Sequence, residues 1–221
     1  MMDARLSGIL KSRGIRGVLV GPWIMGTHSL RRLRLDWPAF SAVGFGHGLL
    51  WPEIPRVTNN QYRSMRLILR ELIALGYRRI GAYVSAGGVD SNWEAGFYIG
   101  TRDKVPSACL LEYEYYDQSR LEEWIRKEKL EVVIIPHEMG VAPLQRAFRV
   151  PEELGVASCL VHSRNSESSG LFQNFAYTGA RAVDLLVSFI HANQRGIPEF
   201  PERILIEGEW VPGKTLRRIV R

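Results

Sequence analysis

Two histidines follow apolar runs that are typical of buried parallel strands. His137 is separated from Val132–Ile135 by Pro136, and His162 comes directly after Val156–Val161. Ligands of open α/β sheets bind at the carboxyl ends of the strands, so these imidazoles are candidates for binding a polar molecule. Two ordinary loop histidines would give the same pattern. A metal pair is a third interpretation because His is a common metal ligand, but no third ligand is evident, so we predict no metal and no cofactor.

Two tryptophans stand beside predicted turns and could contact the same molecule. Trp23 follows a short apolar run at 17–21, and Trp93 follows the turn at 86–88, where a helix is predicted to begin. An indole face can stack on the apolar face of a sugar ring. Core packing is the alternative for each tryptophan.

The sequence carries no recognisable catalytic motif. It has no Gly-x-Ser-x-Gly elbow, no Walker loop, and no Gly-x-Gly-x-x-Gly after a predicted strand. Glu122 and Glu123 are adjacent on a predicted helix, so they point to different faces and cannot flank one bond. Cys109 and Cys159 have apolar neighbours, which favours two buried thiols over a disulfide framework or a zinc site. We therefore predict that the protein is not an enzyme.

The composition is that of a globular protein. The 221 residues suffice for one large domain or two small ones, and 46% are hydrophobic and 24% charged, which excludes disorder as the main state. No apolar run approaches the roughly 18–20 residues of a membrane span, and the first residues lack an apolar signal core. We expect a cytoplasmic protein without a membrane partner. The net charge of +6 permits nucleic-acid contact without arguing for it.

Strand-like and helix-like segments alternate along the chain, which is typical of parallel sheets covered by helices on both faces. Helical spacing of apolar residues predicts the helices, and short apolar runs predict the strands. The predicted helices are Arg5–Arg13, His28–Asp36, Gln61–Leu75, Asn92–Arg102, Ser119–Glu128, Glu138–Arg149 and Tyr177–His191. The predicted strands are Gly17–Gly21, Phe40–Phe45, Arg79–Ser85, Leu110–Tyr116, Val132–Ile135, Val156–Val161 and Ile204–Glu209.

Several short stretches stand in a specific order, although each alone is a weak signal. They are Ile54-Pro55-Arg56-Val57 followed by Asn60, then Leu72–Ile80, Glu94-Ala95-Gly96-Phe97, Val150–Val156, Phe172–Phe175 and Gly179–Leu186. In this order and spacing they resemble the effector-binding core of the lactose-repressor (LacI/GalR) family of transcription regulators. The segment before Ile54 fits that family less specifically.

The resemblance implies an α/β fold of two Rossmann-like subdomains with parallel sheets, of the periplasmic-binding-protein-like type (type I). In that family the chain crosses three times between the subdomains, and a small molecule, often a sugar, binds between them. Hinge closure around the molecule changes DNA affinity through linkage. The implied N-terminal lobe is 1–57 with 174–208, and the implied C-terminal lobe is 58–173 with 209–221.

Family members carry a helix-turn-helix DNA-binding domain and a further strand and helix ahead of the segments found here. The first predicted helix, Arg5–Arg13, resembles the second helix of the family's sensor core. We therefore expect a truncated N-terminal lobe, and contact with DNA only through a missing N-terminal domain. The resemblance also implies a homodimer.

The positions that match the family's ligand contacts mostly depart from its charged pattern. Ser91 stands where the family has Arg, and Asn60, His137 and His162 stand where it has Asp, so the site has lost its anionic character. Gln173 lies at the second implied crossing, as a hinge residue or a ligand contact. The candidate ligand-binding residues are Trp23, Asn60, Ser91, Trp93, His137, His162 and Gln173. A stand-alone solute-binding protein, an enzyme on a similar pair of lobes, and a degenerate sensor without a ligand are the alternatives.

Overall fold

The chain forms two compact α/β units in the computed structural model, which describes residues 2–21, 33–46, 51–85 and 92–220. Unit 1 comprises residues 1–59 and 174–206, and unit 2 comprises residues 60–173 and 207–221. The chain therefore passes from one unit to the other three times. The lobe boundaries expected from the resemblance remain a prediction.

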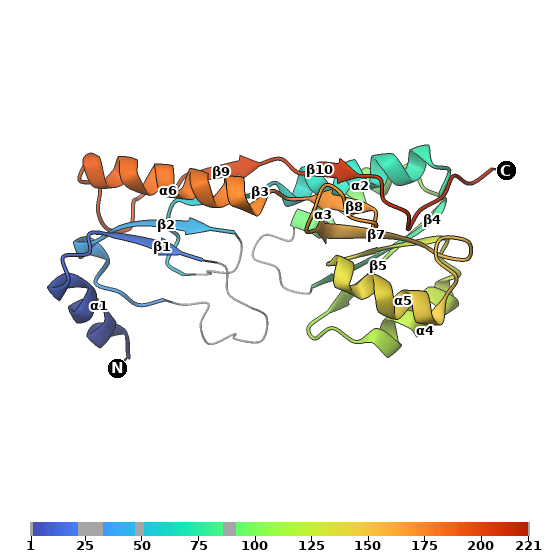
Figure 1. The fold of residues 1–221 in the computed structure, drawn as a ribbon, viewed down its shortest axis with the longest axis horizontal. Helices are drawn as coiled ribbons and strands as arrows, with labels where there is room; N and C mark the ends of the chain where they lie inside the picture. Colours follow the sequence, from blue (N-terminus) through green and yellow to red (C-terminus); the bar gives the residue numbers. More distant parts are fainter. Residues whose placement is uncertain (1, 22–32, 47–50, 86–91, 221) are drawn as a thin grey trace. The chain divides into compact units, whose positions relative to one another are not determined.

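Unit 1 is built on a parallel sheet with the strand order β1-β2-β3-β9. Its strands are β1 (Gly17–Val20), β2 (Ser41–Phe45), β3 (Arg56–Asn59) and β9 (Arg203–Ile206). Its helices are α1 (Met2–Ser12), the 3₁₀ turn η2 (Trp37–Ala39) and α6 (Phe175–His191). Helix α6 lies along this sheet and contacts β1, β2 and β3 (Figure 1).

Both faces of the unit 1 sheet are covered. Successive strand residues point to opposite faces, so Val43 packs under α6 with Ala182, whereas its neighbour Ala42 packs on the other face with Trp37. In β2 this burial on both faces accompanies a short, largely apolar run. The equally buried β3 is more polar, since it contains Arg56, Thr58 and Asn59.

Unit 2 has a larger sheet with the strand order β10-β8-β7-β6-β4-β5. Its strands are β4 (Arg79–Ser85), β5 (Ser107–Tyr113), β6 (Val132–Ile135), β7 (Gly155–Val161), β8 (Gly170–Phe172) and β10 (Glu209–Val211). They are parallel except for β10, which pairs antiparallel with β8 at the edge. Its helices are α2 (Gln61–Ala74), α3 (Asn92–Thr101), α4 (Gln118–Glu128), the 3₁₀ turn η3 (Glu138–Gly140) and α5 (Val141–Ala147).

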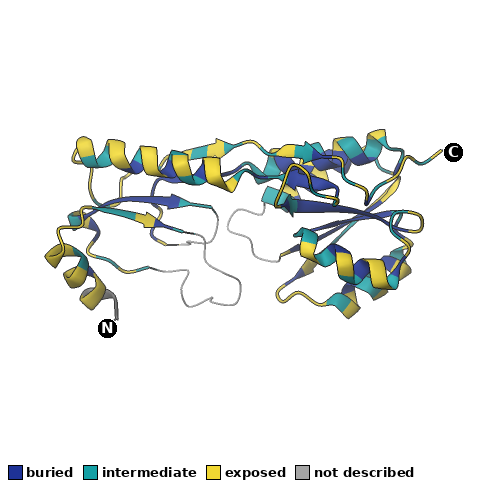
Figure 2. Cartoon of the chain, in the orientation of Figure 1, coloured by how far each residue is buried: buried dark blue, intermediate teal, exposed yellow. Residues whose placement is uncertain are grey.

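The unit 2 sheet is sandwiched between two helical layers. Ile134 packs with α2 and α3, whereas its neighbour Ile135 packs with α4 and α5. Figure 2 shows the central strands as buried and the helices over them as exposed on one side. This arrangement confirms the predicted fold class of parallel sheets covered on both faces by helices.

The strand order places a topological switch point between β4 and β6. From β4 the chain runs to β5 on one side of the sheet, and then back to β6 and β7 on the other side. In open α/β sheets the crevice for ligands lies outside the carboxyl ends of the strands at such a point. His137 follows β6 there, one residue after Pro136.

Two predicted elements are displaced in the structure. The strand predicted at 110–116 is β5 at 107–113, because its register is set by pairing with β4, in which Ser85 lies opposite Tyr113. The helix predicted at 138–149 is instead the turn η3 followed by the shorter helix α5, which ends at Ala147.

The helix predicted at 28–36 is wrong where it can be assessed. Residues 28–32 lie outside the described part of the chain, and residues 33–36 are not helical. Leu33 and Leu35 both pack against the cluster that contains Trp37, which is the two-residue period of an extended segment.

The strand predicted at 204–209 is also wrong, because the chain crosses between the units inside it. Residues 203–206 form β9 in unit 1, and residues 209–211 form β10 in unit 2. The sequence patterns did not predict β3, β8 or β10, which have only three or four residues each. Within the described residues, no helix is long and apolar enough to cross a membrane.

Candidate ligand-binding site

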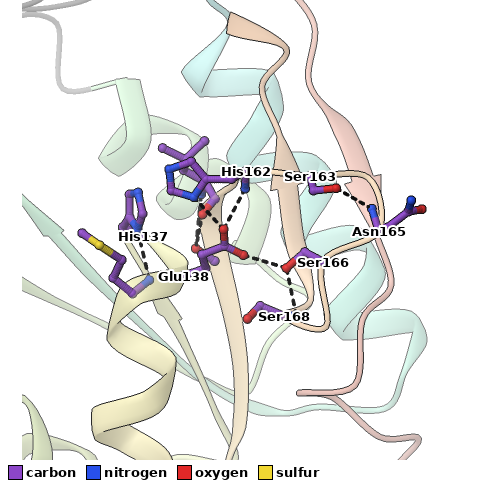
Figure 3. A network of polar contacts seen from close by, with 10 residues as sticks. His137, Glu138, His162, Ser163, Asn165, Ser166 and Ser168 are labelled. Carbon is purple, nitrogen blue, oxygen red and sulfur yellow. Dashed lines mark hydrogen bonds and ion pairs between the residues drawn. The ribbon is translucent and has the colours of Figure 1, made fainter.

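The structure brings two of the predicted site residues together. β6 and β7 are adjacent and parallel, with Ile135 opposite Ser158, so the histidines that follow them lie at the same edge of the sheet. The rings of His137 and His162 are 4.6 Å apart between centroids and meet edge to face at 60° (Figure 3). His137 is half-buried, whereas the His162 side chain is 60% exposed.

Glu138 connects this pair to the loop that follows β7. Its Oε1 atom accepts from the backbone N–H of His162 at 2.8 Å and lies 2.6 Å from the ring Nδ1 of the same residue. Its Oε2 atom accepts from the hydroxyl of Ser166 at 2.6 Å (Figure 3). Burial raises the pKa of Glu138, but the hydrogen bonds from Ser166 and His162 together lower it further, so the carboxyl group is ionised at neutral pH.

The serine-rich loop holds the hydroxyl of Ser166 in a defined direction. The backbone N–H of Ser168 donates to Ser166 Oγ at 3.0 Å, and that of Asn165 donates to Ser163 Oγ at 3.1 Å. Because Ser166 Oγ accepts from Ser168, its proton is left to donate to Glu138. The loop thus supports the carboxylate that in turn contacts His162 (Figure 3).

The hydrogen bonds give the two imidazoles opposite proton positions. A carboxylate can only accept, so Nδ1 of His162 carries a proton and Nε2 of the neutral ring is an acceptor. Nδ1 of His137 accepts from the backbone N–H of Met139 at 3.1 Å, so the proton of its neutral ring is on Nε2, which is a donor. Burial and the neighbouring His162 lower the pKa of His137, with a smaller opposite effect of Glu138, which favours the neutral ring.

This geometry opposes a metal ion between the two rings. Coordination through Nε2 of His137 would require the proton to move to Nδ1, which faces the N–H of Met139. The part of the chain that the structure describes also holds no group of three His, Cys, Asp or Glu side chains arranged for a metal. The arrangement is suited instead to hydrogen bonding with a polar organic molecule.

Three other predicted site residues have contacts within unit 2. Asn60 caps helix α2, since its Oδ1 accepts from the N–H of Arg63. Trp93 packs against the hydrophobic cluster on the α2 and α3 side of the sheet. Gln173 is buried and donates from Nε2 to the carbonyl of Cys159 at 2.6 Å. Their roles in ligand binding remain predictions.

Trp23 and Ser91 lie outside the residues that the structure describes. The two cysteines are free, and Cys159 is buried as predicted, whereas Cys109 is only half-buried.

Sequence reasoning missed Glu138 and Ser166. The sequence does place the Glu138 carboxyl group directly after His137, but the pattern around Glu138 predicts only the first turn of a helix there. Its contact with His162 joins residues 24 apart in sequence, and the contact with Ser166 joins residues 28 apart. These partners depend on how β6 and β7 are paired, which no local pattern contains.

Comparison with known proteins identifies the fold. No protein-family profile and no curated protein matches the sequence. A transcription-regulator-like protein from Staphylococcus haemolyticus matches with a TM-score of 0.69 at 16% identity, over 97% of this chain and 80% of that one.

Two sugar-bound structures match similarly. A LacI-family transcriptional regulator from Enterococcus faecium with bound ribose has a TM-score of 0.72 at 12% identity, over 99% of this chain and 85% of that one. A periplasmic binding protein/LacI transcriptional regulator from Alkaliphilus metalliredigens complexed with D-xylulofuranose has a TM-score of 0.68 at 15% identity, over 96% of this chain and 82% of that one. The chain therefore has the periplasmic-binding-protein-like fold of LacI-family effector domains, which its motif order indicated.

Proposed function

We propose that this chain is the ligand-sensing core of a transcription regulator, and that its effector is a small neutral polar molecule such as a sugar. The observation that carries the proposal is the pair His137 and His162, which share the carboxyl edge of the unit 2 sheet beside its switch point. The structures with bound ribose and D-xylulofuranose support a sugar as the ligand class, because they share this fold.

In the proposed mechanism, binding is coupled to movement of the two units about the three chain crossings. A ligand that binds one arrangement of the units more tightly shifts the population toward it. In a regulator that joins this core to a DNA-binding domain, the shift becomes a change in DNA affinity. The proposal includes a homodimer in the cytoplasm, and binding without chemical turnover.

A calorimetric binding screen tests the sensing role. The panel contains neutral pentoses, hexoses and disaccharides, together with sugar acids and nucleosides. We expect a neutral sugar to bind, and His137→Ala and His162→Ala each to weaken binding by about 3–10-fold, as expected for the loss of one hydrogen bond. The control is His191→Ala, which changes an exposed histidine at the end of α6 and is expected to bind like the wild type.

The screen has two outcomes that count against the proposal. A panel without any binding ligand rejects the sensing role. Binding that neither His137→Ala nor His162→Ala weakens rejects this site.

Solution scattering with the bound ligand tests the coupling to movement, and the expected result is a smaller radius of gyration than without ligand. An unchanged radius at saturation rejects closure.

Sedimentation is expected to show a dimer, and the ligand is expected to be recovered unaltered. A monomer, or a converted ligand, rejects the corresponding part of the proposal.

A further inference from the structure

We infer that Glu138 determines the specificity of this site by holding His162 in the Nδ1–H form, so that His137 and His162 present one hydrogen-bond donor and one acceptor side by side. The ligand class that follows is a neutral molecule with two neighbouring hydroxyl groups, or with a primary amide. The ligand part of this inference rests on the proposed function, whereas the proton positions can be measured without any ligand.

The geometry around Glu138 makes the His162 ring hard to turn. One oxygen of Glu138 faces both the backbone N–H and the ring Nδ1 of His162, at 2.8 and 2.6 Å. The Glu138 side chain is only 19% exposed, so a ring that turned away would leave a largely desolvated carboxylate oxygen short of one donor. Ser166 occupies the other oxygen at 2.6 Å, which keeps the carboxylate from rotating to another partner.

His137 is held in the opposite form by an independent contact. It is the N-cap of η3, and its Nδ1 atom accepts from the N–H of Met139. Its Nε2 atom therefore carries the proton, whereas that of neutral His162 does not. Neither Nε2 atom makes a hydrogen bond to another described residue, so the protein's described residues leave the hydrogen-bonding capacity of both atoms unused.

A donor beside an acceptor discriminates between ligand classes. Two neighbouring hydroxyl groups can accept from His137 and donate to His162 at once, and a primary amide can do the same. A carboxylate has no proton for His162, and an ammonium group has no acceptor for His137. A polar group left unpaired in a binding site costs affinity, so charged ligands of either sign are disfavoured.

Nuclear magnetic resonance tests the proton positions directly. Two-bond and three-bond ¹H–¹⁵N correlation spectra distinguish protonated from unprotonated ring nitrogens. Variants in which one histidine is replaced at a time assign the signals of the five histidines. At neutral pH we expect His162 protonated at Nδ1 and His137 at Nε2. In Glu138→Leu and Glu138→Ala we expect the His162 signals to move toward the Nε2–H form, while those of His137 keep their pattern. Two Glu138 variants are made so that a folded protein without the acceptor is available.

Glu138→Gln separates the hydrogen bond from the charge. Its amide oxygen can still accept from His162, so the Nδ1–H form is expected to persist. Glu123→Leu is the control, because Glu123 is exposed on α4, away from this contact network, and we expect wild-type spectra for it. An Nε2–H pattern or a doubly protonated ring for His162 in the wild type, or the same pattern in the wild type and Glu138→Leu, overturns the inference.

Ligand affinities then test the specificity itself. For a neutral sugar found in the screen, we expect Glu138→Leu to lose about tenfold in affinity, and Glu138→Gln to stay within about threefold of the wild type. The corresponding sugar acid is expected to bind at least about tenfold more weakly than the sugar to the wild type, and this ratio is expected to shrink in Glu138→Leu. The remaining outcome is that the expected proton positions are found while the ratio of sugar to sugar-acid affinity is the same in Glu138→Leu and the wild type. That result would reject Glu138 as the specificity residue without contradicting the sensing role.

Discussion

Asn60 and Glu207 are hydrogen bonded although 147 residues separate them: Nδ2 of Asn60 donates to Oε1 of Glu207 at 3.0 Å. Asn60 is the first residue of unit 2 after the first chain crossing, and Glu207 is the first after the third crossing. Arg63 contacts the same carboxylate at 3.3 Å. The contact joins two segments of unit 2 that enter it from different parts of the chain, and it assigns to Asn60 a structural role beside the predicted role in ligand binding.

Replacing Asn60 separates these two roles. Asn60→Ala removes the cap of α2, and we expect the free energy of unfolding to fall by about 1 kcal/mol. Asn60→Ser keeps an uncharged capping oxygen but loses the amide N–H group that donates to Glu207, so a smaller loss is expected. Urea unfolding followed by circular dichroism measures both. A variant with wild-type stability but weakened ligand binding would instead support the predicted ligand contact.

Acidification is expected to destabilise the protein through His137 and Glu138. The pKa of His137 is lowered in the folded state, so its contribution to stability is fully present above the ordinary value of 6.5 and is lost as the pH falls below that value. The pKa of Glu138 is also lowered, so its contribution is present above 4.5 and is lost as the pH falls through the folded-state value. Both groups therefore act in the same direction, in successive pH ranges.

Urea unfolding between about pH 8 and pH 4 measures this dependence. His137→Asn keeps a side chain that can cap η3, and it is expected to flatten the stability curve below pH 6.5. Glu138→Gln is expected to flatten it below pH 4.5. Parallel curves for the wild type and both variants would show that neither group contributes.

Two glycines inside helices are expected to respond to alanine with opposite signs. A Cβ atom on Gly96 of α3 would lie 2.7 Å from the carbonyl oxygen of Tyr62 and 2.9 Å from Cβ of Met65, so Gly96→Ala forces α2 and α3 apart. We expect a loss of about 1–3 kcal/mol. Gly179 of α6 has nothing within 4 Å of that position, so Gly179→Ala is expected to gain about 0.5–1 kcal/mol. Thermal unfolding measures both, and a neutral Gly96→Ala would contradict the close approach of the helices.

The two thiols are expected to react slowly in the folded protein. Burial raises the pKa of Cys109 to about 11, with a smaller effect of Glu128, and burial also raises that of the fully enclosed Cys159. The thiolate is the reactive form, so labelling with an aromatic disulfide reagent near pH 8 should be slow, with Cys109 ahead of Cys159. Cys109→Ser identifies the faster site, and urea should make both fast. Rapid labelling of the native protein at Cys159 would contradict its burial.

The alternation of apolar runs with helical patterns indicated the fold class, because most strands that are buried on both faces are nearly continuous apolar runs. Val132–Ile135 illustrates this point, since the structure gives β6 the same bounds as the prediction. The sequence also predicted the helix that begins at Gln61, because its apolar residues repeat at helical spacing and Asn60 is a suitable N-cap residue. The histidines after β6 and β7 were found for the same reason, since parallel strands bring their carboxyl ends to one edge.

Tertiary structure alone decided the rest. The bounds of β5 depend on pairing with β4, and β8 and β10 are too short to have a period of their own. The segment after Arg203 belongs to two sheets because the chain crosses between the units there. Glu138, His162 and Ser166 meet through strand pairing and a loop, so their hydrogen bonds, and the proton positions that follow from them, depend on residues distant in sequence. Sequence patterns within one segment indicate which of its side chains are buried. Which polar groups of different segments face each other depends on how the strands pair in the folded sheet.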